Sequence, residues 1–307
     1  MSVTGGSAVY IDGPWSHRSI SANGTRFHIA DSGDGPLVLM LHGFPQFWWM
    51  WRRQLTSLPG DGFRAVASDM RGYGGSDKPP RGYDLITAAS DAAGLIRALG
   101  EANAVVVGPD WGALVAWTMA AYYPKVVRRL AIVSAAHPLR MRADMLAGPV
   151  RRRWRNGSTI GFQLPVLPES RLVRENAEQV GRMLRAWSGP GWPDRETESR
   201  YRAAMVIPLV AHSALEYHRW FLRSWLRTDG IRYRHRMRSP IGLPTLHLHG
   251  AMDPCVPTRS ARASARYVDG PYRWRIIDGA GHFLPEEQPE KFDSALRNWL
   301  ADPEPER

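Results

Sequence analysis

The residue whose surroundings are most suggestive of chemistry is Asp110. It lies at the centre of Gly108-Pro109-Asp110-Trp111-Gly112, between the apolar run 104–107 and the helical pattern 113–121. A strand, a Gly-x-X-x-Gly turn and a helix form the context of a nucleophile elbow, which exposes the central side chain at the end of a sheet. Esterases have serine there, whereas a carboxylate can also attack saturated carbon and leave an ester that water cleaves. The elbow therefore predicts opening of a strained ring or displacement of a halide; the alternative is an ordinary turn with an aspartate at a helix start.

Two further polar residues follow apolar, strand-like runs later in the chain. Asp253 comes just after the run 245–249, and His282 comes after the run 272–277. Taken singly, Asp253 is a turn residue and His282 is a loop histidine. The order nucleophile, acid, histidine is the one that accompanies a nucleophile elbow. We therefore expect His282 to act as general base toward water, with Asp253 orienting its imidazole and stabilising the charged form.

The loop His42-Gly43-Phe44-Pro45 follows the apolar run 37–41. In a sheet with an elbow, this loop supplies the second amide of the oxyanion hole. The backbone N–H groups of Phe44 and Trp111 are therefore expected to face the carbonyl oxygen of an Asp110 ester. His42 is expected to be a structural hydrogen-bonding residue.

The elements that position these residues alternate between strands and helices. Asn23-Gly24 joins the first two runs and is a strong hairpin signal, and the later alternation predicts βαβ units and a parallel sheet. The strand-like runs are 16–20, 25–30, 37–41, 63–68, 104–107, 130–134, 245–249 and 272–277, and the clearest helices are 86–99, 113–121 and 291–300. Residues 138–240 hold no confident strand and look like helices broken by Pro-rich turns. We therefore expect a core domain made of 1–137 and 241–307, with 138–240 as an inserted helical lid.

Charge and composition narrow the class of protein. The net charge is +11, and residues 138–240 alone hold 20 arginines, no lysine and 9 acidic residues, so the whole excess lies in the lid. These arginines are spread along helices and form no recognised DNA- or RNA-binding motif, so nucleic acid is not an expected partner. The chain has one cysteine, no run long enough to span a bilayer and no secretory signal at its start, which favours a cytoplasmic protein without membrane insertion.

With these motifs in place, the chain resembles the epoxide hydrolases of the α/β-hydrolase fold, over roughly residues 20–300. The resemblance is carried by His-Gly-Phe-Pro-Gln at 42–46, Asp-Met-Arg-Gly-Tyr-Gly-Gly-Ser-Asp at 69–77, the elbow at 108–112, Asp253 and Gly281-His282. It implies an α/β fold with a mostly parallel eight-stranded sheet, flanking helices and a helical lid. It also implies that Asp110 attacks an epoxide carbon and that water activated by His282 cleaves the alkyl ester to a vicinal diol. Neither a metal nor an organic cofactor is implied, and Trp111 lines the pocket.

The lid departs from the pattern of this family, whose members place two tyrosines over the nucleophile to bind and protonate the epoxide oxygen. The slot of the early tyrosine, ahead of Phe162-Gln163, holds Ser158. The late slot aligns with His218, and Tyr217 stands one residue earlier. Because successive helical residues are turned by about 100°, only one of these two can face the nucleophile. His218 and Tyr217 are therefore alternative hydrogen-bond donors.

Other functions stay open at this point. A haloalkane dehalogenase shares the aspartate and often the following tryptophan, but it usually has a halide-binding asparagine at the position of Phe44. A biosynthetic hydrolase with an altered lid, or a relative that only binds ligands, is a third reading. A metal enzyme is not supported because the histidines lack ligand spacing such as His-Glu-x-x-His. The expected partner is a small-molecule epoxide, and a homodimer is one option for the assembly.

Overall fold

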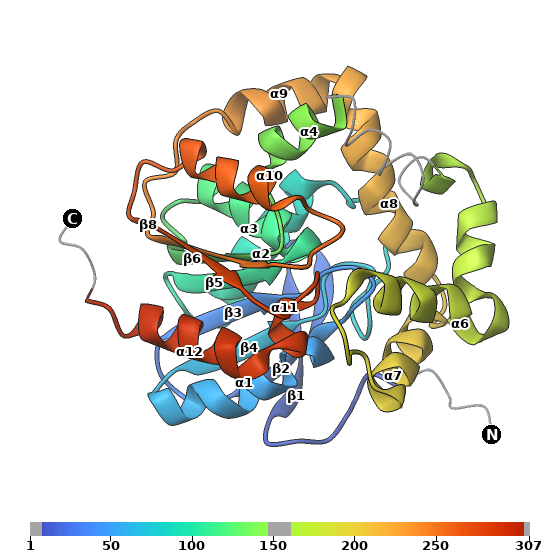
Figure 1. The fold of residues 1–307 in the computed structure, drawn as a ribbon, viewed down its shortest axis with the longest axis horizontal. Coiled ribbons are helices and arrows are strands. Elements are labelled where there is room, and N and C mark those ends of the chain that lie inside the picture. Colours follow the sequence, from blue (N-terminus) through green and yellow to red (C-terminus); the bar gives the residue numbers. More distant parts are fainter. Residues whose placement is uncertain (1–7, 147–160, 304–307) are drawn as a thin grey trace.

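The computed structural model describes residues 8–146 and 161–303, and its centre is an eight-stranded sheet. The strand order is β1-β2-β4-β3-β5-β6-β7-β8 (Figure 1). The strands are β1 (Ser16–Ala22), β2 (Thr25–Ser32), β3 (Leu37–Leu41), β4 (Arg64–Ser68), β5 (Ala104–Pro109), β6 (Val127–Val133), β7 (Thr245–Gly250) and β8 (Tyr272–Ile277). β1 pairs antiparallel with β2 and β2 pairs antiparallel with β4, while the neighbours from β4 to β8 pair in parallel. The predicted mostly parallel eight-stranded sheet is confirmed.

The hairpin between β1 and β2 turns at Asn23-Gly24. Both residues have positive φ, 48° and 70°. Two successive positive φ angles are what a two-residue type I′ turn needs, and this turn matches the twist of the flanking strands. Ala22 is consequently paired with Thr25, as the sequence signal predicts.

Helices cover both faces of the sheet. In Figure 1, α1 and α12 lie on one side and α2 and α3 on the other. The helices are α1 (Arg52–Ser57), α2 (Leu85–Ala98), α3 (Asp110–Tyr122), α4 (Pro138–Leu146), α6 (Leu167–Trp187), α7 (Arg195–Met205), α8 (Val210–Arg223), α9 (Thr228–Arg236), α10 (Thr258–Arg262), α11 (Leu284–Glu287) and α12 (Pro289–Leu300). Every residue of β3 and β5 is buried, as expected for strands covered on both faces.

Between β6 and β7 the described residues form helices and no strand. These helices, α4 and α6 to α9, occupy the stretch expected to form a lid and are called the lid segment below. Figure 1 shows α6, α7 and α8 gathered at one end of the sheet. α6 is interrupted at 174–177, where the backbone leaves helical angles. No helix among the described ranges combines the length and apolar character that crossing a membrane demands.

Candidate active site

The turn between β5 and α3 holds Asp110 in a strained backbone conformation, with φ of 46°. Positive φ is uncommon for a residue with a side chain and persists only where the surroundings enforce it. The flanking glycines allow the close approach: a Cβ on Gly108 would lie 2.4 Å from the carbonyl carbon of Gly112, and one on Gly112 would lie 2.5 Å from the carbonyl oxygen of Leu41. Asp110 therefore opens α3 at the carboxyl end of a central strand, as a nucleophile elbow requires.

The Asp110 carboxylate lies between a backbone donor and an imidazole. The Phe44 N–H donates to its Oδ2 at 2.8 Å, and Nε2 of His282 lies 3.7 Å from its Oδ1. Gly43 makes room for this approach, because a Cβ there would lie 2.8 Å from Cβ of Asp110. Trp111 is the second residue of α3, so its N–H has no acceptor within the helix. Of the two amides expected to form an oxyanion hole, that of Phe44 contacts the carboxylate, and that of Trp111 belongs to the next residue of the chain.

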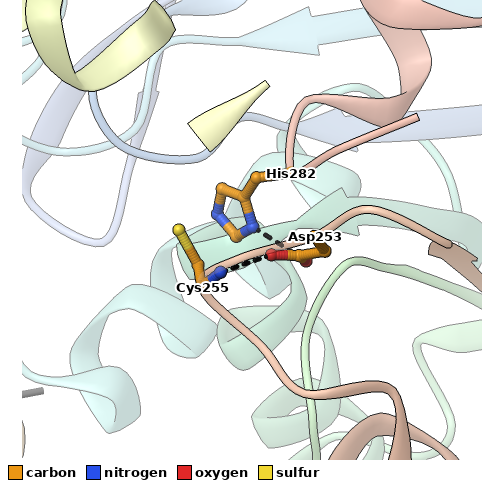
Figure 2. A group of neighbouring side chains, drawn as sticks. All are labelled: Asp253, Cys255 and His282. Atoms are coloured by element: carbon orange, nitrogen blue, oxygen red, sulfur yellow. Dashed lines mark hydrogen bonds and ion pairs between the residues drawn. The ribbon is translucent and has the colours of Figure 1, made fainter. Parts of the chain in front are cut away.

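His282 and Asp253 form a hydrogen-bonded pair. Nδ1 of His282 lies 3.0 Å from Oδ2 of Asp253 (Figure 2), and the two side chains are only 3% and 0% exposed. Oδ1 of Asp253 accepts from the N–H groups of Cys255 and Val256 at 2.7 and 3.0 Å, so the carboxylate orientation is fixed by its own loop. The structure therefore brings together Asp110, His282 and Asp253, whose loops follow β5, β8 and β7.

Glu287 holds the His282 loop and was not foreseen from the sequence. Its carboxylate accepts hydrogen bonds from the N–H groups of Gly281 at 2.7 Å, Phe283 at 2.7 Å and Gly189 at 2.6 Å. Gly281 and Phe283 flank the histidine, and Gly189 belongs to the lid segment. One carboxylate thus joins the His282 loop to the segment between β6 and β7, and only tertiary structure could have identified it.

The charges at this site are coupled. Burial alone would raise the pKa of Asp110, but the close approach and charge of His282, with the Phe44 N–H, bring it below its ordinary value. Burial alone would lower the pKa of His282, but the charge of Asp253 and the contact with Asp110 raise it to about 10. At neutral pH the resting site therefore holds an ionised carboxylate beside an imidazolium.

Of the two lid donor candidates, His218 contacts the residues on both sides of the Asp110 carboxylate, Phe44 and Trp111. Its ring lies 5.0 Å from the ring of Phe44 and 4.7 Å from that of Trp111, centroid to centroid. Nε2 of His218 accepts from the indole N–H of Trp111 at 3.1 Å, and Nδ1 lies 3.0 Å from the carbonyl oxygen of Ala214. An indole only donates and a carbonyl only accepts, so His218 is neutral with its proton on Nδ1. Burial lowers the pKa of His218 and so also favours the neutral form of its ring.

Tyr217 is directed elsewhere. Its side chain is fully buried, and its hydroxyl donates to the carbonyl oxygen of Arg71 at 3.0 Å. The phenol O–H of Tyr217 is thus bonded to a backbone carbonyl group and is not directed at Asp110. Ser158, which aligns with the early tyrosine, lies outside the described residues.

Two other residues near the site have clear positions. His42 uses both ring nitrogens on backbone groups: Nδ1 lies 2.9 Å from the Gly43 carbonyl oxygen and Nε2 accepts from the Met70 N–H at 3.0 Å. These contacts fit the structural function expected of it. Trp187 lies with its ring 5.9 Å from that of His282, and its carbonyl oxygen accepts from the His282 N–H at 2.8 Å.

Cys255 is a further neighbour that sequence reasoning missed. Figure 2 shows its side chain beside the ring of His282, in the same loop as Asp253. Donor atoms of Asp253, Cys255 and His282 all lie within 4.8 Å of one another. The spacing Asp-x-Cys placed the thiol near Asp253, but the approach of His282 depends on the fold.

Comparison with known proteins gives concordant matches. A family model described as alpha/beta hydrolase fold matches residues 36–289. Epoxide hydrolase 3 of Xenopus tropicalis is 31% identical over 290 residues, covering 91% of this chain and 75% of that protein. Epoxide hydrolase A of Mycobacterium tuberculosis is 30% identical over 322 residues, covering 92% and 96%. Among solved structures, epoxide hydrolase A from Mycobacterium thermoresistibile has a TM-score of 0.80 at 28% identity, with 93% of this chain and 98% of that chain covered.

Proposed function

Because this chain belongs to the epoxide hydrolase family of the α/β-hydrolase fold, we propose that it hydrolyses an epoxide to a vicinal diol through a covalent ester of Asp110. The observation that carries the proposal is the Asp110 carboxylate, held at the elbow between the Phe44 N–H and His282. A carboxylate that is ionised, partly exposed and fixed in position is suited to attack carbon. Its side chain is 25% exposed, so a substrate can reach it.

In the first step an oxygen of Asp110 attacks one epoxide carbon. The new carbon–oxygen ester bond forms as the ring carbon–oxygen bond breaks, and the electron pair of the broken bond goes to the epoxide oxygen. That oxygen needs a proton or a strong hydrogen bond because an alkoxide is a poor leaving group. His218 is the lid group at the nucleophile, and it can supply a proton from Nε2 when it is doubly protonated while Nδ1 continues to donate to Ala214.

In the second step water cleaves the ester. Alkylation removes the negative charge of Asp110, one of the causes that raise the pKa of His282, so the imidazolium releases its proton to solvent and becomes a base when the ester has formed. Neutral His282 then takes a proton from water, and the hydroxide attacks the ester carbonyl carbon. The N–H groups of Phe44 and Trp111 stabilise the oxyanion, and its collapse releases the diol, whose alkoxide oxygen takes the proton from His282. The carboxylic acid left on Asp110 passes its proton to His282, which restores the resting ion pair.

The direct test is intact-mass measurement of a His282→Ala variant incubated with a panel of epoxides and haloalkanes. Ring opening still proceeds in this variant while ester cleavage stalls, so the protein mass rises by the mass of the whole epoxide. His282→Ala combined with Asp110→Asn is the matched control and should acquire no mass. An adduct with haloalkanes and none with any epoxide would favour dehalogenation and overturn the proposal.

A further inference from the structure

The loop that orients the catalytic histidine also brings together three different kinds of metal ligand. The carboxylate of Asp253, the thiol of Cys255 and one ring nitrogen of His282 each offer a donor atom, and these atoms lie within 4.8 Å of one another (Figure 2). Among the described ranges 8–146 and 161–303, no other set of histidine, cysteine and acidic side chains meets this condition. The cluster is therefore a specific feature of this loop.

The donor set selects for a particular class of ion. Thiolate sulfur, imidazole nitrogen and carboxylate oxygen are the three ligand types of Zn²⁺, whereas Mg²⁺ and Ca²⁺ prefer oxygen alone. We propose that Asp253, Cys255 and His282 form a binding site for Zn²⁺ or a similar borderline-soft divalent ion, and that occupancy stops hydrolysis. The inhibition rests on the function proposed above, while the binding does not.

A second carboxylate lies close to the cluster. The Asp110 carboxylate lies 3.7 Å from His282 and its side chain is 25% exposed, so one of the two carboxylates near the proposed site is reached by solvent. A bound divalent cation takes the sulfur of Cys255 as a thiolate and one ring nitrogen of His282 as a lone-pair donor, so the thiol proton and the proton on that nitrogen leave to solvent.

Binding and catalysis compete for the same atoms. A ring nitrogen that coordinates an ion has no free lone pair, so His282 cannot then take a proton from water. An ion held by Asp253 also weakens the hydrogen bond that orients the imidazole. Occupancy is therefore expected to abolish ester cleavage, and removal of the ion should restore it.

Cobalt titration of the full-length chain tests binding without substrate. Co²⁺ replaces Zn²⁺ and gives a near-ultraviolet charge-transfer band when a thiolate coordinates it. Cys255 is the only cysteine in the sequence, so such a band can come from no other residue. We expect the band at one Co²⁺ per chain, its loss on addition of Zn²⁺, and its absence in Cys255→Ser. No band in the wild-type chain would overturn the proposal.

Turnover measurements test the inhibition. Zn²⁺ should cause near-complete loss of epoxide hydrolysis in the wild-type chain, EDTA should restore it, and Mg²⁺ should have no effect. In Cys255→Ser the loss at the same Zn²⁺ concentration should be much smaller, each variant being compared with its own metal-free rate. Unchanged or increased turnover while the cobalt band forms would overturn the inhibitory part. A chain that forms the band but opens no epoxide would support the site and count against the proposed function instead.

Discussion

The indole N–H of Trp111 donates to Nε2 of His218 across a distance of 3.1 Å. One partner follows the proposed nucleophile directly, and the other replaces a lid tyrosine of the family pattern. Because Nδ1 of His218 is bonded to Ala214, both ring nitrogens are occupied in the resting state. His218 can donate to an epoxide oxygen only after it gains a second proton and releases the indole.

Replacement of His218 by phenylalanine should slow ring opening. The variant removes the lid group that protonates the epoxide oxygen, and loss of such a general acid costs on the order of 10²–10⁴-fold. The rate of formation of the Asp110 adduct, measured in the His282→Ala background by quenching and mass, checks this. Tyr217→Phe is the matched control. The hydroxyl that it removes is hydrogen-bonded to the carbonyl oxygen of Arg71, so this substitution should change the rate of adduct formation little. Equal effects of the two substitutions would contradict the assignment.

Ring opening should become slower as pH rises. Burial lowers the pKa of His218, so its donating imidazolium form is the minor species at neutral pH and declines further as pH increases. Because the pKa of Asp110 is lowered, this carboxylate stays ionised at the acid end of the range. Protonation of Asp110 therefore does not hide the decrease of the ring-opening rate with rising pH. Adduct formation in the wild-type chain, followed by rapid quenching and mass between about pH 5 and 8, should show this slope.

Two substitutions probe the origin of that slope. Trp111→Phe removes a donor that favours the unprotonated Nε2, so the decline should move to higher pH. His218→Tyr should flatten the profile over the same range, because a phenol stays protonated there. A profile that is unaltered in both variants would exclude titration of His218 as its cause.

Most of the fold could be predicted because buried strands and the elbow each have a recognisable pattern of neighbouring residues: an apolar run for a strand, and Gly-x-X-x-Gly for the elbow. The limits of β6 show where this fails. The predicted strand started at Leu130, but the observed strand starts at Val127, since Arg129 is buried and its guanidinium donates to the Trp299 carbonyl oxygen at 2.7 Å. A charged residue breaks the apolar pattern, and only its distant partner explains its burial.

Some residues of the candidate site could likewise be predicted from the sequence, and others could not. Asp110, Asp253 and His282 each follow a recognisable strand, so the topology of a parallel sheet brings them to one edge. The choice between Tyr217 and His218 depends on the rotation of α8, which is set by contacts with Arg71, Phe44 and Trp111. The spacing of apolar residues predicts that a helix forms and which of its faces is buried. It does not predict which residues of the rest of the protein each face contacts.

Asp253→Asn should separate the two chemical steps. The amide no longer stabilises the charged imidazole or selects the correct tautomer of His282, and the corresponding substitution in a serine protease triad costs about 10⁴-fold. Ester cleavage should slow by a comparable factor while ring opening changes far less, so the adduct accumulates during turnover. Single-turnover mass measurement would show this, and an unmodified protein throughout would contradict it.

Gly112→Ala should damage both stability and activity because of where its new methyl group would lie. The added Cβ would stand 2.5 Å from the carbonyl oxygen of Leu41, a backbone atom with little freedom to move. Overpacking of this kind costs about 1–3 kcal/mol in unfolding free energy. The same strain moves the elbow away from the loop after β3, so the 2.8 Å contact between the Phe44 N–H and Asp110 should lengthen and both chemical steps should slow.

Gly60→Ala is the control, because a Cβ there meets nothing within 4 Å. Thermal unfolding and adduct kinetics of the two variants should therefore differ, and a Gly112→Ala protein with unchanged ring opening would show that the amide contact does not depend on this packing.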